Sequence, residues 1–182
     1  MDGAATLRVD LLTAAEQERD AKDATLRFDV PRIAAHLMGA TEWAAHELAP
    51  DVREIALVGA STGAAAALVA AASRPETVRA VVARGGRVDL AGDALGRIRA
   101  PTLLIVGGAD EQTLLLNREA MRRIRAPVRL EIVANAGHTF EEPGALGQVG
   151  ELTRRWLRAR FSFSGRIGAR LATLRLAGRV RG

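Results

Sequence analysis

Residues 55–72 read I-A-L-V-G-A-S-T-G-A-A-A-A-L-V-A-A-A, and this stretch decides the fold. The first four residues are apolar and predict a buried strand, whereas the alanine-rich run after Gly63 predicts a helix. The turn between them, G-A-S-T-G (59–63), places two glycines around a serine. A strand that passes directly into a helix brings the two segments close together. We therefore expect side chains to be excluded at Gly59 and Gly63.

The same turn makes Ser61 a candidate nucleophile. A G-x-S-x-G motif between a strand and a helix places its serine at the apex of a strained turn, with the hydroxyl exposed above the sheet. The helix that starts at Thr62 offers free N–H groups and a partial positive charge to an anion. The alternative is a tight strand-to-helix turn without chemistry, but the strand before the motif and the helix after it favour the nucleophile.

Composition limits the classes of protein that this chain can belong to. Its 182 residues suffice for one domain, and 48% of them are apolar. Cysteine is absent, which excludes disulfides, thiolate metal sites and a cysteine nucleophile. Aromatic residues make up 3%, too few to predict a stacking surface for single-stranded nucleic acid. We find no secretory leader and no apolar run long enough for a membrane span, and expect a soluble cytoplasmic protein.

The net charge of +5 is confined to the C-terminal tail. Residues 161–182 contain five arginines and no acidic residue, and the remaining 21 basic residues are balanced by 21 acidic ones. We therefore expect a neutral domain over residues 1–160 and a flexible basic tail over 161–182, with no specific nucleic-acid partner. A weak amphipathic helix that binds an anionic membrane or nucleic acid is the alternative for the tail, but its glycines disfavour a firm helix.

Strands and helices alternate along the chain. Apolar runs predict further strands at 5–12, 78–83, 101–106 and 128–133, and three-to-four spacing predicts helices at 31–48, 113–124 and 143–160. Residues 13–29 are polar and are expected to form a surface loop or a short helix. Nearly continuous apolar strands that alternate with helices predict an α/β fold, in which a mostly parallel sheet is covered by helices on both faces.

Two further polar residues follow strands in the same way as Ser61. Asp110 comes shortly after the strand at 101–106, and His138 shortly after the strand at 128–133. The carboxyl ends of parallel strands meet at one edge of a sheet, where ligands collect. A serine, a histidine and an aspartate at that edge predict nucleophilic catalysis, with Ser61 activated by His138 and Asp110 orienting the imidazole.

Other residues of the same types fit these roles less well. Asp89 is the second choice for the acid, but it lies in the glycine-rich loop 84–96, where it is better explained as a turn former. His36 and His46 precede Ser61 on the helix at 31–48, and we interpret them as structural or surface histidines. The loop at 84–96 lacks the lysine and glycine register of a phosphate-binding loop, so no cofactor or metal is expected.

Five segments together resemble the α/β-hydrolase superfamily, and within it the dienelactone hydrolase-like branch that occurs alone or fused to phosphoribosyltransferase domains. They are D-L-L-T (10–13), G-A-S-T-G-A-A-A-A-L-V-A-A-A (59–72), R-G-G-R-V-D-L-A-G-D-A-L (84–95), A-P-T-L-L-I-V-G-G-A-D (100–110) and A-G-H-T-F-E-E-P-G-A-L (136–146). The resemblance covers residues 4–158. It implies Ser61 as nucleophile, Asp110 as acid, His138 as base, and a small ester or lactone as substrate.

The chain departs from this family before D-L-L-T. Family members carry three further strands there, and an H-G-x-G loop after the third of them supplies an oxyanion donor in addition to the Thr62 N–H. We therefore expect an N-terminally truncated hydrolase domain with impaired activity. Without the third strand, the strand at 5–12 is expected either to leave a gap beside the strand that leads to Ser61 or to pair with it directly. The alternative function is a catalytically inactive domain that serves as an interaction or appended module.

Overall fold

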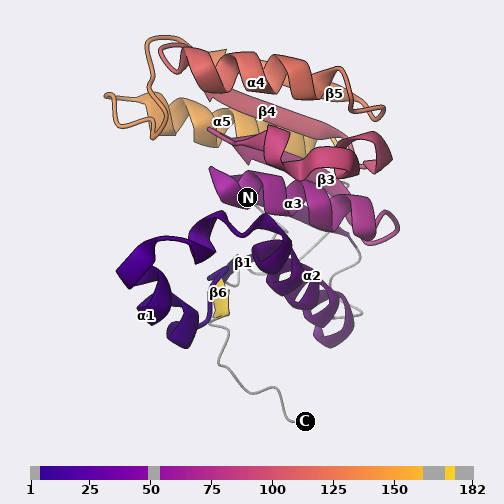
Figure 1. Cartoon of the computed structure of the whole chain (residues 1–182). Helices are drawn as coiled ribbons and strands as arrows, with labels where there is room; N and C mark the ends of the chain where they lie inside the picture. Colours follow the sequence, from indigo (N-terminus) through magenta and orange to yellow (C-terminus); the bar gives the residue numbers. More distant parts are fainter. Residues whose placement is uncertain (1–4, 49–53, 162–170, 175–182) are drawn as a thin grey trace.

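The computed structural model describes residues 5–48, 54–161 and 171–174 of the chain (Figure 1). Four strands form a parallel sheet in the order β2-β3-β4-β5. The strands are β1 (Thr6–Val9), β2 (Ile55–Ala60), β3 (Val78–Arg84), β4 (Thr102–Gly107), β5 (Val128–Val133) and β6 (Leu171–Leu174). The helices are α1 (Ala14–Asp23), α2 (Val30–Glu47), α3 (Thr62–Ser73), α4 (Glu111–Met121) and α5 (Ala145–Arg158), with 3-10 segments η1 (Leu26–Phe28) and η2 (Val88–Arg97).

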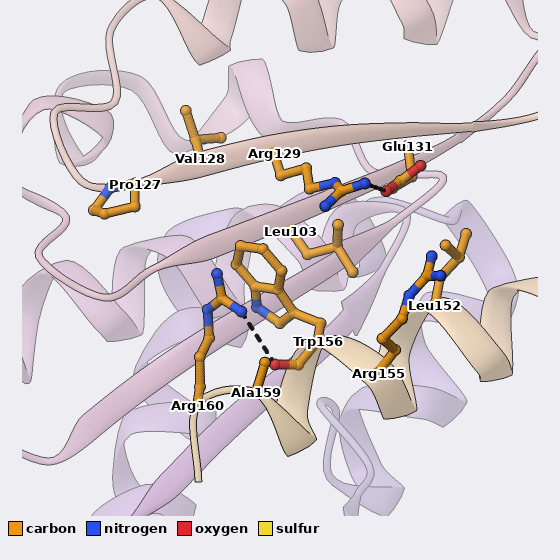
Figure 2. A pocket seen from close by; sticks show the side chains of 10 residues that line it. All are labelled: Leu103, Pro127, Val128, Arg129, Glu131, Leu152, Arg155, Trp156, Ala159 and Arg160. Atoms are coloured by element: carbon orange, nitrogen blue, oxygen red, sulfur yellow. Dashed lines mark hydrogen bonds and ion pairs between the residues drawn. The ribbon is translucent and has the colours of Figure 1, made fainter.

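Alternating side chains of the sheet supply two cores. Leu104 of β4 packs into the larger core, which contains the alanine face of α3 together with residues of η2 and α4. Leu103 and Ile105 point to the opposite face and pack with Trp156 of α5 (Figure 2). Both cores are needed because β4 is buried along its whole length. The predicted α/β class, a parallel sheet with helices on both faces, is therefore confirmed.

Helix α3 begins where β2 ends, and the turn between them is as tight as predicted at Gly59. A Cβ atom on Gly59 would lie 2.3 Å from the carbonyl oxygen of Gly63, a distance that no side chain tolerates. At Gly63 the expectation is only partly right, because a Cβ there would meet the flexible side chain of Leu11 at 3.2 Å rather than strand backbone. The close approach allows α3 to bury four consecutive alanines. Ala64, Ala65 and Ala67 belong to the core shared with the sheet, whereas Ala66 packs with Ile33 and Ala34 of α2.

Strand β1 lies apart from the main sheet. It pairs in parallel with β6, and in the described part of the chain no strand pairs with the outer edge of β2. Of the two arrangements expected for this region, the structure therefore has the gap. Val58 of β2 is 59% exposed, although its partner in the register, Val82 of β3, is fully buried. The face that α5 covers over β3, β4 and β5 is thus open over β2.

The other elements agree with the sequence within a few residues. Asp29 caps α2, since its carboxylate accepts a hydrogen bond from the Arg32 N–H at 3.1 Å. The polar region 13–29 contains α1, which Thr13 and Glu16 cap reciprocally. The glycine-rich loop contains η2. Four residues of the predicted flexible tail form β6, and the rest of the tail after Phe161 lies outside the described residues. No helix in the described ranges has the length and hydropathy that crossing a membrane requires.

Replacing Gly59 by alanine is expected to separate β2 from α3. The added Cβ would collide with Gly63 backbone, which cannot rotate away, so we expect the free energy of unfolding to fall by about 3 kcal/mol or more. Gly39 on the exposed side of α2 is the matched control. A Cβ there meets nothing within 4 Å, and Gly39→Ala is expected to raise stability by up to about 1 kcal/mol. Urea titrations of both variants measure this difference, and similar stabilities would contradict it.

Candidate active site

Ser61 occupies the apex of the turn between β2 and α3 in a strained conformation. Its φ of 52° and ψ of −126° are rare for a residue with a side chain. Its N–H donates to the carbonyl of Arg84 at 3.2 Å, and its own carbonyl accepts from Arg87 N at 3.3 Å. These bonds fix the turn against the loop that follows β3. The hydroxyl is partly exposed and makes no hydrogen bond to any described residue.

Asp110 and His138 are in contact. His138 Nδ1 lies 2.7 Å from Asp110 Oδ2, so the imidazole nitrogen and the carboxylate share a short hydrogen bond. Asp110 directly precedes α4 and also caps it, since its other oxygen accepts from Thr113 N at 3.2 Å. The Asp110 side chain is 14% exposed and that of His138 is 43% exposed. The carboxylate is therefore sheltered, while the imidazole is open to solvent.

The pKa of Asp110 is lowered from its ordinary value. Burial alone would raise this pKa, but hydrogen bonds from Thr113 and His138 favour the ionised carboxylate and outweigh burial. An ionised Asp110 accepts a hydrogen bond from Nδ1–H, which leaves Nε2 of His138 as the nitrogen that can take up a proton. This is the tautomer that a general base next to a serine requires.

Gly107 at the end of β4 allows the two loops to meet. A Cβ at Gly107 would lie 2.2 Å from the carbonyl oxygen of Ala136, so the chain that leads to His138 crosses directly over this glycine. Ala109 N donates to the same Ala136 carbonyl at 2.9 Å. Because these two chain segments cross at Gly107, Asp110 of one segment lies next to His138 of the other.

The loop after β5 is held in place by residues that the sequence did not single out. Glu142 accepts a hydrogen bond from Gly137 N at 2.8 Å and so closes the loop around His138. Phe140 is buried with a φ of 59°, and the Arg84 guanidinium lies 5.8 Å from the centre of its ring. The backbone carbonyl of Arg84 also accepts the hydrogen bond from the Ser61 N–H. Arg84 therefore contacts both the turn that holds Ser61 and the loop that holds His138. In the sequence, the two glycines after Arg84 could have pointed to a close contact there, whereas nothing in the sequence pointed to Glu142.

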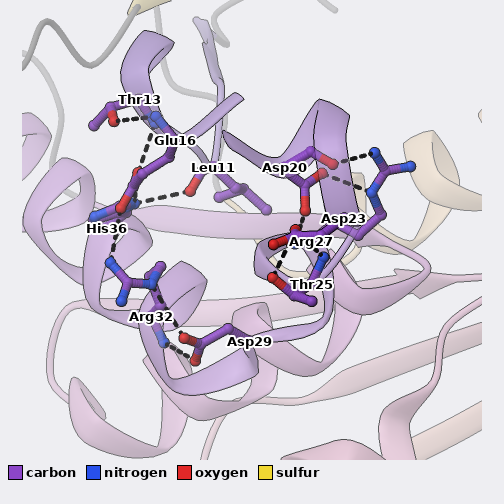
Figure 3. A network of polar contacts seen from close by, with 10 residues as sticks. All are labelled: Leu11, Thr13, Glu16, Asp20, Asp23, Thr25, Arg27, Asp29, Arg32 and His36. Carbon is purple, nitrogen blue, oxygen red and sulfur yellow. Dashed lines mark hydrogen bonds and ion pairs between the residues drawn. The ribbon is translucent and has the colours of Figure 1, made fainter. Parts of the chain in front are cut away.

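Thr62 borders a pocket of about 230 Å³ that residues before β2 line on its other sides. Its apolar wall consists of Leu11, Leu12 and Ile33. Figure 3 shows how the wall is fixed, because His36 Nδ1 lies 2.9 Å from the carbonyl oxygen of Leu11. His36 is thus a structural histidine, as interpreted from the sequence.

The remaining alternatives from the sequence have other partners than Asp110 and His138. The carboxylate of Asp89 is engaged by the Arg87 guanidinium through two hydrogen bonds, of 3.0 and 2.8 Å. His46 is exposed near the end of α2, next to Glu47. In the ranges that the structure describes, no group of three or more histidine, aspartate and glutamate side chains is arranged to hold a metal ion.

A strained serine between a parallel strand and its helix, at the sheet edge where a histidine and an aspartate meet, is typical of α/β hydrolases. The fold places the chain in that class. The model of the dienelactone hydrolase family matches residues 9–165, and the chain therefore belongs to this family.

Solved structures support the same assignment. A dienelactone hydrolase from Anabaena variabilis ATCC 29413 is 48% identical and superposes with a TM-score of 0.81, over 84% of this chain and 71% of that one. A predicted CIB-like hydrolase from Thermoplasma acidophilum is 25% identical, with a TM-score of 0.56 over 69% of this chain and 60% of that one.

The curated relatives are longer proteins. Two proteins of Mycobacterium tuberculosis, from strains CDC 1551 and H37Rv, are 50% identical over 156 residues, and their names assign them provisionally to the phosphoribosyl transferases. The match covers 85% of this chain but only 34% of each relative. The chain thus spans about a third of the length of the curated relatives it matches.

Replacing Asp110 by asparagine is expected to change how stability depends on pH. The folded-state pKa of Asp110 is lowered, so its carboxylate contributes stability above the ordinary carboxyl pKa of about 4 and loses that contribution as the pH falls through the folded-state value. We expect Asp110→Asn to be about 1 kcal/mol less stable than wild type at pH 7, with a difference that shrinks below about pH 4. Denaturant titrations from pH 2.5 to 7 measure it, and a constant difference would contradict the assignment.

Proposed function

We propose that this chain is a serine hydrolase that acts on the carbonyl of an ester or lactone through Ser61, His138 and Asp110. The observation that carries the proposal is the hydrogen bond between His138 and Asp110 at the same sheet edge as the strained Ser61. The pair of His138 and Asp110 supplies a base of defined tautomer, and the turn at Ser61 supplies a partly exposed hydroxyl. Membership in the dienelactone hydrolase family supports the same reaction class.

In the proposed reaction, the Ser61 oxygen attacks the carbonyl carbon while His138 Nε2 accepts the hydroxyl proton. The tetrahedral intermediate collapses, and His138 returns the proton to the leaving alcohol oxygen, which in a lactone stays attached to the acyl group. Water then attacks the acyl carbon while His138 Nε2 accepts its proton. The bond to the Ser61 oxygen breaks, His138 returns the proton to that oxygen, and the acid is released. Asp110 remains ionised throughout and stabilises the imidazolium. We expect the hydrogen bond between Ser61 and His138 to form when substrate binds. Catalytic hydrogen bonds are often long or poorly aligned in enzymes without substrate and tighten in the complex.

Thr62 is the proposed oxyanion donor. Its N–H is at the first position of α3, where a helix has no internal acceptor for it. The resemblance implies a second donor from an H-G-x-G loop, and the sequence contains no H-G dipeptide. One missing donor costs on the order of 10²–10³ in turnover. We therefore expect slow hydrolysis of activated esters by this chain.

The second candidate is a non-catalytic domain appended to another protein. Two observations favour it: the Ser61 hydroxyl makes no hydrogen bond to His138, and the curated relatives extend well beyond the matched region. Under this proposal, the longer relatives' phosphoribosyl transferase names describe the partner domain.

Labelling with a fluorophosphonate tests the nucleophile. We expect wild type to be labelled covalently at Ser61, and labelling to disappear in Ser61→Ala and to fall at least about 100-fold in His138→Ala, which lacks the base. The matched control is Ser73→Ala, which removes an exposed serine at the other end of α3 and is expected to be labelled like wild type.

The same set of variants separates the two candidates. Labelling that persists in Ser61→Ala would exclude this serine as the nucleophile. Equal turnover of 4-nitrophenyl acetate by wild type and His138→Ala, at the rate of the buffer alone, would favour the non-catalytic domain.

A further inference from the structure

A second pocket lies between β5 and the C-terminal end of α5. Its volume is about 260 Å³. Its apolar wall includes Leu103, Val128 and Leu152, and the indole of Trp156 forms its centre (Figure 2). Leu103 and Val128 stand near the amino ends of β4 and β5, whereas Ser61 and His138 follow the carboxyl ends of their strands. The pocket is therefore at the opposite end of the sheet from the candidate active site.

Basic side chains dominate the polar part of this pocket. Arg129, Arg155 and Arg160 line it together with one acid, Glu131. Glu131 is engaged by Arg129 at 2.6 Å (Figure 2). Arg155 and Arg160 form no ion pair with any described residue. The residues that line the pocket thus carry more positive than negative charge.

Arg160 and Trp156 also hold donors without acceptors. The Arg160 guanidinium stacks on the Trp156 indole, 3.1 Å from the ring centre, and its Nη1 donates to the Trp156 carbonyl at 3.3 Å. Arg160 Nε and Trp156 Nε1 are both buried and have no hydrogen-bond partner among the described residues. Trp156 as a whole is only 8% exposed. Buried N–H donors are rarely left without an acceptor in proteins.

The charge of Arg160 is correspondingly unfavourable in this environment. Burial, and then the positive charge of Arg129, lower the pKa of Arg160 from its ordinary value. Basic residues near a helix C-terminus complement its partial negative charge, which accounts for arginines in the last turn of α5. It does not account for donors that are buried without acceptors, nor for two guanidinium groups on one apolar pocket.

We propose that this pocket binds a small organic anion, whose carboxylate or phosphate group is held by Arg160 and Arg129 and whose apolar body rests on Trp156 and the leucines. An oxyanion supplies the acceptors that the described chain lacks, and guanidinium groups bind both carboxylate and phosphate through parallel hydrogen bonds. A volume of about 260 Å³ is below the usual range for drug-sized ligands and suits a body the size of one aromatic ring.

Fluorescence of Trp156 tests this site directly. The chain has two tryptophans, and Trp43→Phe removes the other, on α2, so that emission reports on Trp156 alone. We expect a saturable change on titration with benzoate or phenyl phosphate at low salt, and weaker binding at high salt. Benzyl alcohol has a similar body but no charge and is expected to produce no saturable change. Inorganic phosphate, which lacks the apolar body, is expected to bind more weakly than phenyl phosphate.

Variants in the Trp43→Phe background locate the binding charge. Arg160→Gln and Arg129→Gln are each expected to weaken benzoate binding about tenfold or more. Arg129 lies on edge strand β5, so its replacement leaves α5 intact and covers the case in which Arg160→Gln disturbs the helix. Arg158→Gln removes an exposed charge of α5 that does not line the pocket and is expected to bind like the parent.

Three results would overturn the proposal: no saturable change with either anion, equal binding of benzyl alcohol, or an equal loss in Arg158→Gln and Arg160→Gln. An equal loss of binding in these two variants would mean that the anion is attracted by the overall positive charge and not bound in the pocket.

Discussion

The contact between Gly59 and the backbone of Gly63 is the constraint on which the rest of the structure depends. Because no side chain separates β2 from the first turn of α3, the helix lies close enough to the sheet for alanines, together with Leu68, to fill the space between them. The same closeness accounts for the positive φ of Ser61 at the apex of the turn. One steric condition thus produces both the packed core and the strained serine.

A second crossing, at Gly107, has the same character. Main chain from the loop after β5 passes directly over this glycine and brings His138 to Asp110. Asp110 has two duties there, since one carboxylate oxygen caps α4 and the other faces the imidazole. The turn-former and the catalytic interpretations of such an aspartate are therefore compatible, because a carboxylate accepts more than one hydrogen bond.

The sequence was sufficient for the parallel sheet, its helices and the meeting of Asp110 with His138, because these follow from apolar periodicity and from polar residues placed just after strands. It was insufficient where geometry depends on contacts between distant segments. The hold of Glu142 on Gly137, and the contact of Arg84 with both loops, have no local signature. The sequence also did not predict that β1 pairs with β6, because strand pairing depends on which partner strands are present. The sequence likewise had no periodicity that distinguished Arg160, which follows α5 and stacks on Trp156, from Arg158 at the end of α5.

The outer edge of β2, with which no strand in the described ranges pairs, has a consequence for the behaviour of the chain in solution. Its six residues, I-A-L-V-G-A, contain neither a charge nor a proline, and Val58 on it faces solvent. Natural proteins guard such edges with lysine, proline or a bulge, and an unguarded edge is a template for strands from other molecules. We expect such an edge to favour intermolecular β-structure, and a lysine in place of Val58 to oppose it.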